Sequence, residues 1–142
     1  ATDVSAEALE LARANAAAHG VENQLTFVHT SYLDGVADRF DLLVANPPYV
    51  AELDAPALMP EVADHEPHQA LFGGPDGLRN VRAIAALAID ALKPGGGLVM
   101  EIGQGQWPAV RTALAEAGMS DAHVRHDLQV IARVVVATRS AR

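Results

Sequence analysis

The chain has 142 residues, half of them hydrophobic, a formal net charge of −8 and no cysteine. This length suits one domain with a substantial core. No apolar run approaches the ~18 residues that a membrane span needs, and no signal-like start is present, so we expect a soluble, cytoplasmic protein. The missing cysteines exclude disulfides, thiolate metal sites and a cysteine nucleophile, and the negative charge argues against a broad phosphate-binding face.

The first residues predict a strand that leads into a helix. Residues 1–3 resemble the last part of a strand, and Ser5 is a good N-cap for a helix over residues 6–19, which Gly20 ends. A chain that begins inside an element suggests an upstream part. Asp3 stands at the strand-to-helix junction, where an acidic residue can accept hydrogen bonds from both ribose hydroxyls of a nucleotide-like cofactor. The alternative is that Asp3 only favours the positive end of the helix.

A second strand is predicted over residues 25–29, which are rich in β-branched and aromatic side chains. The loop at its carboxyl end contains Ser31 and Tyr32, which are further candidates for binding a cofactor. Ser31 or its backbone can face an adenine ring there. The alternative is that Ser31 is only a loop residue.

The third strand, over residues 40–45, opens into the turn formed by Asn46, Pro47, Pro48 and Tyr49. Ligands of open α/β sheets bind at the carboxyl ends of strands. Consecutive prolines fix φ and restrict the residue before each of them, so the turn is stiff. It can present one amide, two proline carbonyls and one aromatic ring to a substrate. The alternative is that the prolines only end the strand and Tyr49 packs beneath it.

A long irregular stretch follows, over residues 46–78, with a turn predicted near residues 57–63. Such stretches in compact domains are usually functional loops. The apolar residues among its glycines indicate an ordered loop that folds back on the sheet. His65 and His68 flank Glu66, but a proline between them blocks a helix and no other ligand cluster is evident, so we expect no metal. Glu66 is a candidate for a structural or substrate-binding role.

The rest of the chain alternates helix and strand. A helix is predicted over residues 79–92, ended by the Lys-Pro-Gly-Gly segment at 93–96, then a buried strand over 97–102 and a helix over 108–118. This alternation predicts a mostly parallel sheet with crossover helices.

The last two strands are predicted over residues 121–128 and 130–138. So short a link allows only an antiparallel hairpin, which gives the sheet one antiparallel strand. The arginines near the C-terminus are interpreted as solvated charges on this hairpin; they are Arg125, Arg133, Arg139 and Arg142.

The glycine-containing segment from Glu101 to Gly105 stands where a strand meets a helix, which is also the setting of a cofactor-binding loop. If this were the loop that holds S-adenosylmethionine, the protein would be a permuted methyltransferase, in which the Asn-Pro-Pro-Tyr turn comes before the cofactor loop. Too little chain follows to supply the remaining cofactor strands, so we interpret Gly103 and Gly105 as a tight turn at the edge of the site.

Several motifs together resemble the HemK or PrmC type of protein-(glutamine) methyltransferase, nearly across the whole chain. They are Asp3-Val4-Ser5, Asn46-Pro47-Pro48-Tyr49-Val50, Glu66-Pro67, the segment Ala70 to Leu78 with its Gly-Gly-Pro-Asp-Gly-Leu sequence, Lys93-Pro94-Gly95-Gly96 and Glu101-Ile102-Gly103. The Asn-Pro-Pro-Tyr turn is shared with enzymes that methylate the exocyclic amine of adenine, whereas the Glu-Pro and Gly-Gly-Pro-Asp-Gly-Leu segments make the match narrower.

The resemblance implies a Rossmann-like methyltransferase fold, S-adenosylmethionine as methyl donor, and the glutamine of the Gly-Gly-Gln motif of a peptide chain release factor as acceptor. It implies a seven-stranded sheet whose last hairpin supplies the antiparallel strand. Residues 1–142 would then be the C-terminal part of a single catalytic domain. The family's first strand, its glycine-rich cofactor loop and a small helical domain should precede Asp3. Loss of that central strand would leave an unpaired edge and an exposed apolar groove.

Two further departures separate the chain from the usual family pattern. Ser31 stands where many members carry an acidic residue near adenine. The hairpin segment from Asp127 to Arg133 keeps the terminal acid and arginine without the usual glycine and charged residues between them. These differences bear on the protein substrate more than on the reaction type.

We expect Asn46 and Pro47 to accept the two hydrogens of the acceptor amide, with Tyr49 packed on it; Pro48 and Glu66 complete the expected substrate site, and Asn46 also borders the cofactor. One alternative is a methyltransferase that acts on the adenine amine of nucleic acid, with Tyr49 stacked on a flipped base. Another is an inactive fragment that serves as a binding module.

Overall fold

The computed structural model describes residues 1–59, 61 and 67–141. The chain divides into two compact units, Ala1–Asp38 and Arg39–Arg142, and each is described by itself. No helix in the described residues is long and apolar enough to span a membrane.

The first unit pairs two short parallel strands and carries one long helix. Its elements are β1 (Thr2–Asp3), α1 (Ala6–Ala18), the 3-10 helix η1 (Glu22–Gln24) and β2 (Val28–His29). Ser5 caps α1, as predicted, because its hydroxyl accepts a hydrogen bond from the Ala8 backbone at 3.1 Å. The strand predicted over residues 25–29 is shorter in the structure. Its ladder is limited to Val28–His29 because β1 offers only two residues as partners.

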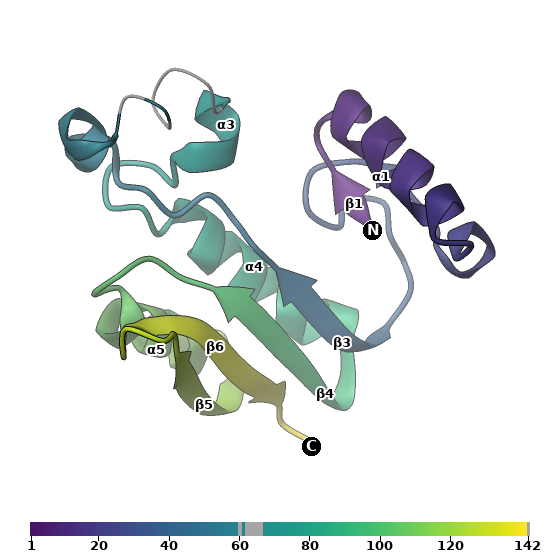
Figure 1. Ribbon diagram of the computed structural model, residues 1–142. Coiled ribbons are helices and arrows are strands. Elements are labelled where there is room, and N and C mark those ends of the chain that lie inside the picture. Colours follow the sequence, from purple (N-terminus) through teal and green to yellow (C-terminus); the bar gives the residue numbers. More distant parts are fainter. Residues whose placement is uncertain (60, 62–66, 142) are drawn as a thin grey trace. The chain divides into compact units, whose positions relative to one another are not determined.

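The second unit is built on a four-stranded sheet in the order β3-β4-β6-β5 (Figure 1). Its strands are β3 (Phe40–Ala45), β4 (Leu92–Glu101), β5 (Met119–His126) and β6 (Ala132–Arg139). β3 runs parallel to β4, whereas β6 runs antiparallel to both β4 and β5. The predicted fold class, α/β with a C-terminal antiparallel hairpin, is therefore confirmed. The resemblance implies one seven-stranded sheet, whereas the described residues form two sheets, of two and four strands.

The helices α4 (Arg79–Ala91) and α5 (Trp107–Glu116) lie against one face of this sheet (Figure 1). Leu98 and Met100 on β4 point to that face and are fully buried. With them the core contains side chains from both helices and from the hairpin: Val81, Ala85, Ala88, Val110, Leu114, Val135 and Ala137. Burial of this apolar stripe on α4 confirms the periodicity seen in the sequence.

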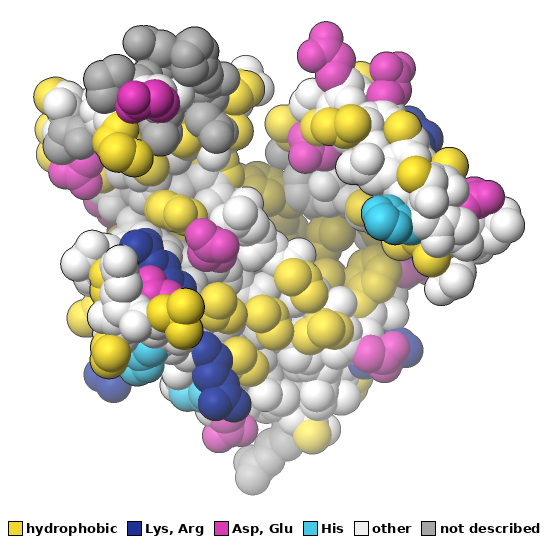
Figure 2. Space-filling model, in the orientation of Figure 1, with side chains coloured by type: hydrophobic (Ala, Val, Ile, Leu, Met, Phe, Trp, Pro, Cys, Tyr) yellow, Lys and Arg dark blue, Asp and Glu magenta, His cyan; other side chains and the backbone are white. Residues whose placement is uncertain are grey.

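The opposite face of the sheet is also apolar. Val44 on β3, Val99 on β4 and Val136 on β6 are neighbours in register and point to it. Leu42 and Val44 keep 54% and 73% of their surface exposed. Hydrophobic side chains gather over this face in Figure 2.

The junction between α4 and β4 differs from the sequence prediction. Helix α4 ends at Ala91, one residue before the predicted end, and the strand predicted over residues 97–102 begins earlier, because β4 starts at Leu92. Phe40 pairs with Leu92 and Leu42 with Gly97, so residues 93–96 form an irregular bulge within the ladder. Lys93 pins this bulge by an ion pair to Asp41 at 2.8 Å.

The hairpin also differs in detail. The predicted one-residue link between the last two strands is wrong, since five residues, 127–131, separate β5 from β6. Asp127 organises this turn, because its carboxylate accepts hydrogen bonds from the backbone of Gln129 and Ile131. Nor are all the nearby arginines simply solvated. Arg133 pairs with Asp127 at 3.1 Å, and Arg139 donates to the Leu92 carbonyl. Arg142 lies outside the described residues.

The long loop between β3 and α4 folds back on itself. Val50 donates to the Leu71 carbonyl and accepts from Gly73, both at 2.9 Å. The loop contains the 3-10 helix η2 (Glu52–Ala57) and the short helix α3 (His68–Leu71). Residues 60, 62 and 63 of the turn predicted near residues 57–63 lie outside the described residues.

Candidate functional site

The Asn-Pro-Pro-Tyr turn follows β3 directly, as the sequence predicts, and stands at the carboxyl end of that strand. Asn46 is exposed, Pro47 is buried, and Pro48 and Tyr49 are half-buried. All four predicted residues therefore lie together in one extended segment. Backbone pairing ends with β3 at Ala45 and resumes at Val50, so another source of hydrogen bonds must hold the turn.

Two side-chain amides supply those hydrogen bonds. Asn80, at the start of α4, donates to the Pro48 carbonyl at 2.8 Å. Gln106, at the N-cap of α5, donates to the Tyr49 carbonyl at 2.8 Å. The Gln106 side-chain oxygen in turn accepts from the Gly103 backbone at 2.8 Å. Two successive carbonyls of the turn are therefore fixed from two different helices.

The Tyr49 side chain is fixed as well. Its hydroxyl donates to a Glu101 carboxylate oxygen at 3.0 Å. Burial raises the pKa of Tyr49 above its usual value, and the hydrogen bond to Glu101 and the charge of that carboxylate raise it further, against a smaller lowering by Arg133. Tyr49 is consequently a neutral phenol at physiological pH, and its ring cannot turn freely.

Glycines allow the backbone of the loop to approach this turn closely. A Cβ at Gly73 would lie 2.7 Å from the Pro48 carbonyl oxygen. A Cβ at Gly77 would clash with the Tyr49 carbonyl, and the positive φ of +72° there independently favours glycine. The Gly-Gly-Pro-Asp-Gly-Leu segment thus packs directly on the turn.

Asp76 holds this glycine segment in its turn. Its carboxylate pairs with Arg82 at 2.7 Å and accepts from the Leu78 backbone at 3.1 Å. The hydrogen bond from Arg82, with a smaller effect of the bond from Leu78, keeps the pKa of Asp76 below its usual value.

The glycine segment after β4 packs on the same turn from another direction. A Cβ at Gly103 would lie 2.9 Å from the Gln106 side-chain oxygen and 3.2 Å from a ring carbon of Tyr49. Gly103 therefore stands at the edge of the site, which agrees with the interpretation of this segment as a tight turn.

The first unit brings the other sequence candidates together at one edge. Asp3 and the loop with Ser31 and Tyr32 stand at the carboxyl ends of the parallel strands β1 and β2. The Thr30 backbone donates to the Asp3 carbonyl at 3.0 Å. The Asp3 side chain accepts from the Ser5 backbone at 2.8 Å, so it does favour the start of α1. Binding of ribose by Asp3 and of adenine by Ser31 and Tyr32 stays a prediction.

Glu66 and His65 lie outside the described residues. In the described part of the chain there is no group of three or more residues that could hold a metal ion. His68 instead stacks at an angle on Phe72, with ring centroids 4.9 Å apart.

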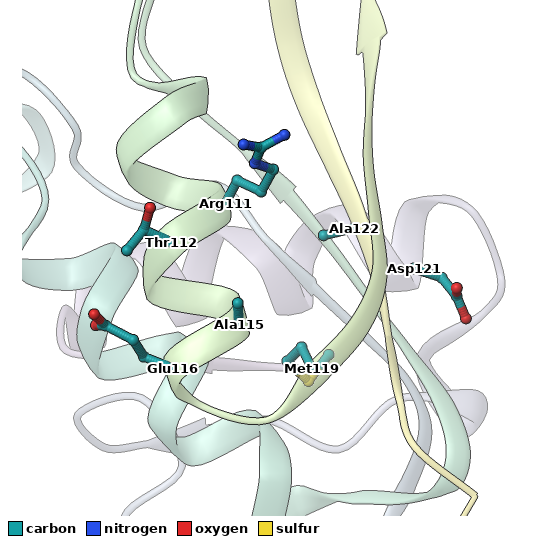
Figure 3. Close-up of a pocket in the computed structure, with 7 residues that line it drawn as sticks. All are labelled: Arg111, Thr112, Ala115, Glu116, Met119, Asp121 and Ala122. Carbon is teal, nitrogen blue, oxygen red and sulfur yellow. The ribbon is translucent and has the colours of Figure 1, made fainter.

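Two surface hollows lie on the second unit. The larger, about 580 Å³, lies between α5 and β5, and in Figure 3 its charged residues Arg111, Glu116 and Asp121 point in different directions. They form no convergent site. The second, about 410 Å³, lies beside η2 and α3 and has Glu52, His68, Phe72 and Arg79 among its lining residues.

Sequence reasoning missed Asn80 and Gln106. Asn80 offered a signal, because it is only 7% exposed and stands in line with Ile84 and Ala88 on the apolar side of α4. Gln106 offered none, since an isolated glutamine at a helix start has many roles.

Known proteins are similar to this chain in sequence. The family described as "Methyltransferase small domain" matches residues 1–68. A release factor glutamine methyltransferase from Bradyrhizobium diazoefficiens is 43% identical over 139 residues, which are 97% of this chain and 47% of that protein. The chain spans about half the length of the curated relatives it matches.

Solved structures show the same fold. A ribosomal protein L11 methylase from Lactobacillus delbrueckii subsp. bulgaricus matches 97% of this chain and 56% of its own at a TM-score of 0.68 and 20% identity. The release factor-specific protein-(glutamine-N5) methyltransferase from Alicyclobacillus acidocaldarius matches 81% of this chain and 64% of its own, at a TM-score of 0.50 and 27% identity. Over 97% of its length, the Asn-Pro-Pro-Tyr turn included, the chain is thus similar to a release factor glutamine methyltransferase.

Proposed function

We propose that this chain is part of the catalytic domain of an enzyme that transfers a methyl group from S-adenosylmethionine to a glutamine side-chain amide, in the Gly-Gly-Gln motif of a peptide chain release factor. The main support is that some hydrogen-bond acceptors of the turn are bound by the protein while others are not. The Pro48 and Tyr49 carbonyls are bound by Asn80 and Gln106. Within the described residues, the Asn46 side chain and the Pro47 carbonyl make no hydrogen bond, which leaves two acceptors for a ligand.

A primary amide suits these two acceptors. Its nitrogen carries two hydrogens, and the Asn46 side-chain oxygen and the Pro47 carbonyl can accept one each. The amide is a poor nucleophile because its lone pair is delocalised, so much of the acceleration must come from positioning. The two oxygens also stabilise positive charge that develops on the nitrogen as the new bond forms.

The aromatic ring of Tyr49 would pack on the acceptor amide. Its hydroxyl is tethered to Glu101, and the ring borders Gly103. A π face favours the positive charge that develops during methyl transfer. The raised pKa of Tyr49 means that its phenol donates to Glu101 and does not act as a base.

S-adenosylmethionine, when bound, supplies an electrophilic methyl group. The residues of the first unit fit this cofactor. The Asp3 carboxylate lies at the carboxyl end of β1, accepts a hydrogen bond from the Ser5 backbone and can accept others from ribose hydroxyls. Ser31 and Tyr32 would border the adenine, and Asn46 would border the reactive end. The cytoplasmic location expected from the sequence is part of the same proposal.

Incubation of the full-length protein with labelled S-adenosylmethionine tests the proposal. Label should appear on a release factor, and it should be lost when alanine replaces the glutamine of the Gly-Gly-Gln motif. Nucleic acid supplied in parallel should stay unlabelled. Label on the adenine amine of RNA or DNA, with none on the release factor, would overturn the proposal in favour of a nucleic-acid methyltransferase.

A further inference from the structure

The segment after β4 contacts the Asn-Pro-Pro-Tyr turn, here called the acceptor turn, through the side chain of Gln106. Gln106 accepts from the Gly103 backbone and donates to the Tyr49 carbonyl, each at 2.8 Å. It therefore bridges two chain segments that are far apart in sequence. Gln106 is half-buried, so water competes poorly for these bonds.

Asn80 acts on the neighbouring carbonyl. It is 7% exposed and donates to Pro48 at 2.8 Å. Because the two bound carbonyls are consecutive, the orientations of two neighbouring peptide units, Pro48–Tyr49 and Tyr49–Val50, are both set. A glycine packs against each carbonyl as well, Gly73 on Pro48 and Gly77 on Tyr49, which leaves little room for the turn to shift.

We propose that Gln106 and Asn80 are positioning residues for methyl transfer; this inference rests on the proposed function. They touch neither the acceptor amide nor the methyl group. They fix the two carbonyls that follow the acceptor atoms of Asn46 and Pro47 and so set the position of those atoms. A misplacement of about 1 Å at a reacting centre can lower the rate by about 100-fold.

The proposal explains why the residue at the α5 N-cap is a glutamine. The position needs an acceptor for Gly103 and a donor for Tyr49, and an amide provides both. The change Gln106→Glu keeps the length and the acceptor but removes the donor, and it sets a carboxylate against the Tyr49 carbonyl. Gln106→Met keeps the approximate length and removes both hydrogen bonds without adding charge.

Both variants are to be measured in the full-length protein. The matched control is Gln104→Glu, the same chemical change two positions earlier at an exposed residue of the same segment. The readouts are kcat and KM for the release factor, the Kd for S-adenosylmethionine by calorimetry, and the Tm. Expressing kcat per cofactor-binding site removes the effect of any unfolded fraction.

We expect Gln106→Glu to lower kcat by about 100-fold and Gln106→Met to lower it by about 10-fold or more, with KM and Kd within about twofold of wild type. Gln104→Glu should match wild type. A normal kcat per cofactor-binding site in both Gln106 variants, with or without a lower Tm, would show a merely structural role and overturn the inference alone. A wild-type protein that fails to label the release factor would overturn the proposed function and the inference with it.

Discussion

Asn46 is the exposed member of the acceptor turn and the residue on which the proposed chemistry most directly depends. The change Asn46→Ala removes one of two oxygens that would hold the acceptor nitrogen. We predict a fall in kcat of about 100-fold or more, with the Kd for S-adenosylmethionine largely kept. Asn23→Ala, an exposed asparagine in η1, is the control. Substantial activity of Asn46→Ala in the full-length protein would count against the amide-holding role.

At the same scale, Tyr49 gives a prediction about pH. Burial and the contact with Glu101 favour the neutral phenol, so the pKa of Tyr49 lies above its usual value of 10.0. A raised folded-state pKa contributes stability that is fully present below about pH 10 and is lost as pH rises through the folded-state value. The ultraviolet difference titration between wild type and Tyr49→Phe should therefore have its midpoint above pH 10.0. A midpoint at or below pH 10.0 would contradict the burial and the Glu101 hydrogen bond.

At the scale of elements, we expect the buried side chains of β4 to contribute strongly to the free energy of unfolding. Leu98 is fully buried between the sheet and its helices, whereas Leu128, in the turn between β5 and β6, is fully exposed. We predict that Leu98→Ala lowers the free energy of unfolding by about 2–5 kcal/mol and that Leu128→Ala changes it by less than about 0.5 kcal/mol. Urea unfolding of the two variants tests this difference. Equal effects would mean that β4 is not the centre of the core.

The hairpin turn gives an acid-sensitivity prediction. Hydrogen bonds from the Ile131 backbone, Arg133 and the Gln129 backbone lower the pKa of the Asp127 carboxyl. A lowered folded-state pKa contributes stability that is present above the unfolded-state value of about 3.9 and is lost as pH falls through the folded-state value. The amide resonances of Gln129 and Ile131 should shift together in that acidic range, and Asp127→Asn should abolish the shift. Resonances that already move near neutral pH would contradict the ion pair.

The elements show where sequence reasoning succeeds. Periodicity and capping identified the helices α1, α4 and α5 and the succession of strands along the chain, because these signals are local. The bulge at residues 93–96 was missed because it depends on the register of β4 against β3. Asn80 and Gln106 were missed for a related reason. The apolar stripe of α4 indicated a buried position for Asn80, but local patterns could not identify the partner of either residue, because the carbonyls lie 32 and 57 residues away along the chain.

At the scale of the whole molecule, the two units divide the proposed work. The unit Ala1–Asp38 carries the predicted cofactor residues Asp3, Ser31 and Tyr32, and the unit Arg39–Arg142 carries the acceptor turn. The net charge of −8 for the whole chain argues against a broad attraction for phosphates. The proposed protein substrate would accordingly be recognised by its shape and its hydrogen bonds.

The hydrogen bonds that hold the turn also have a consequence for biosynthesis. A ribosome makes the Asn-Pro-Pro-Tyr segment first and reaches its partners Asn80, Glu101 and Gln106 only later. A nascent chain that stops before residue 80 contains every residue of the motif but none of these three side chains. The Asn-Pro-Pro-Tyr turn therefore cannot take its final form before the start of α5 has been synthesised.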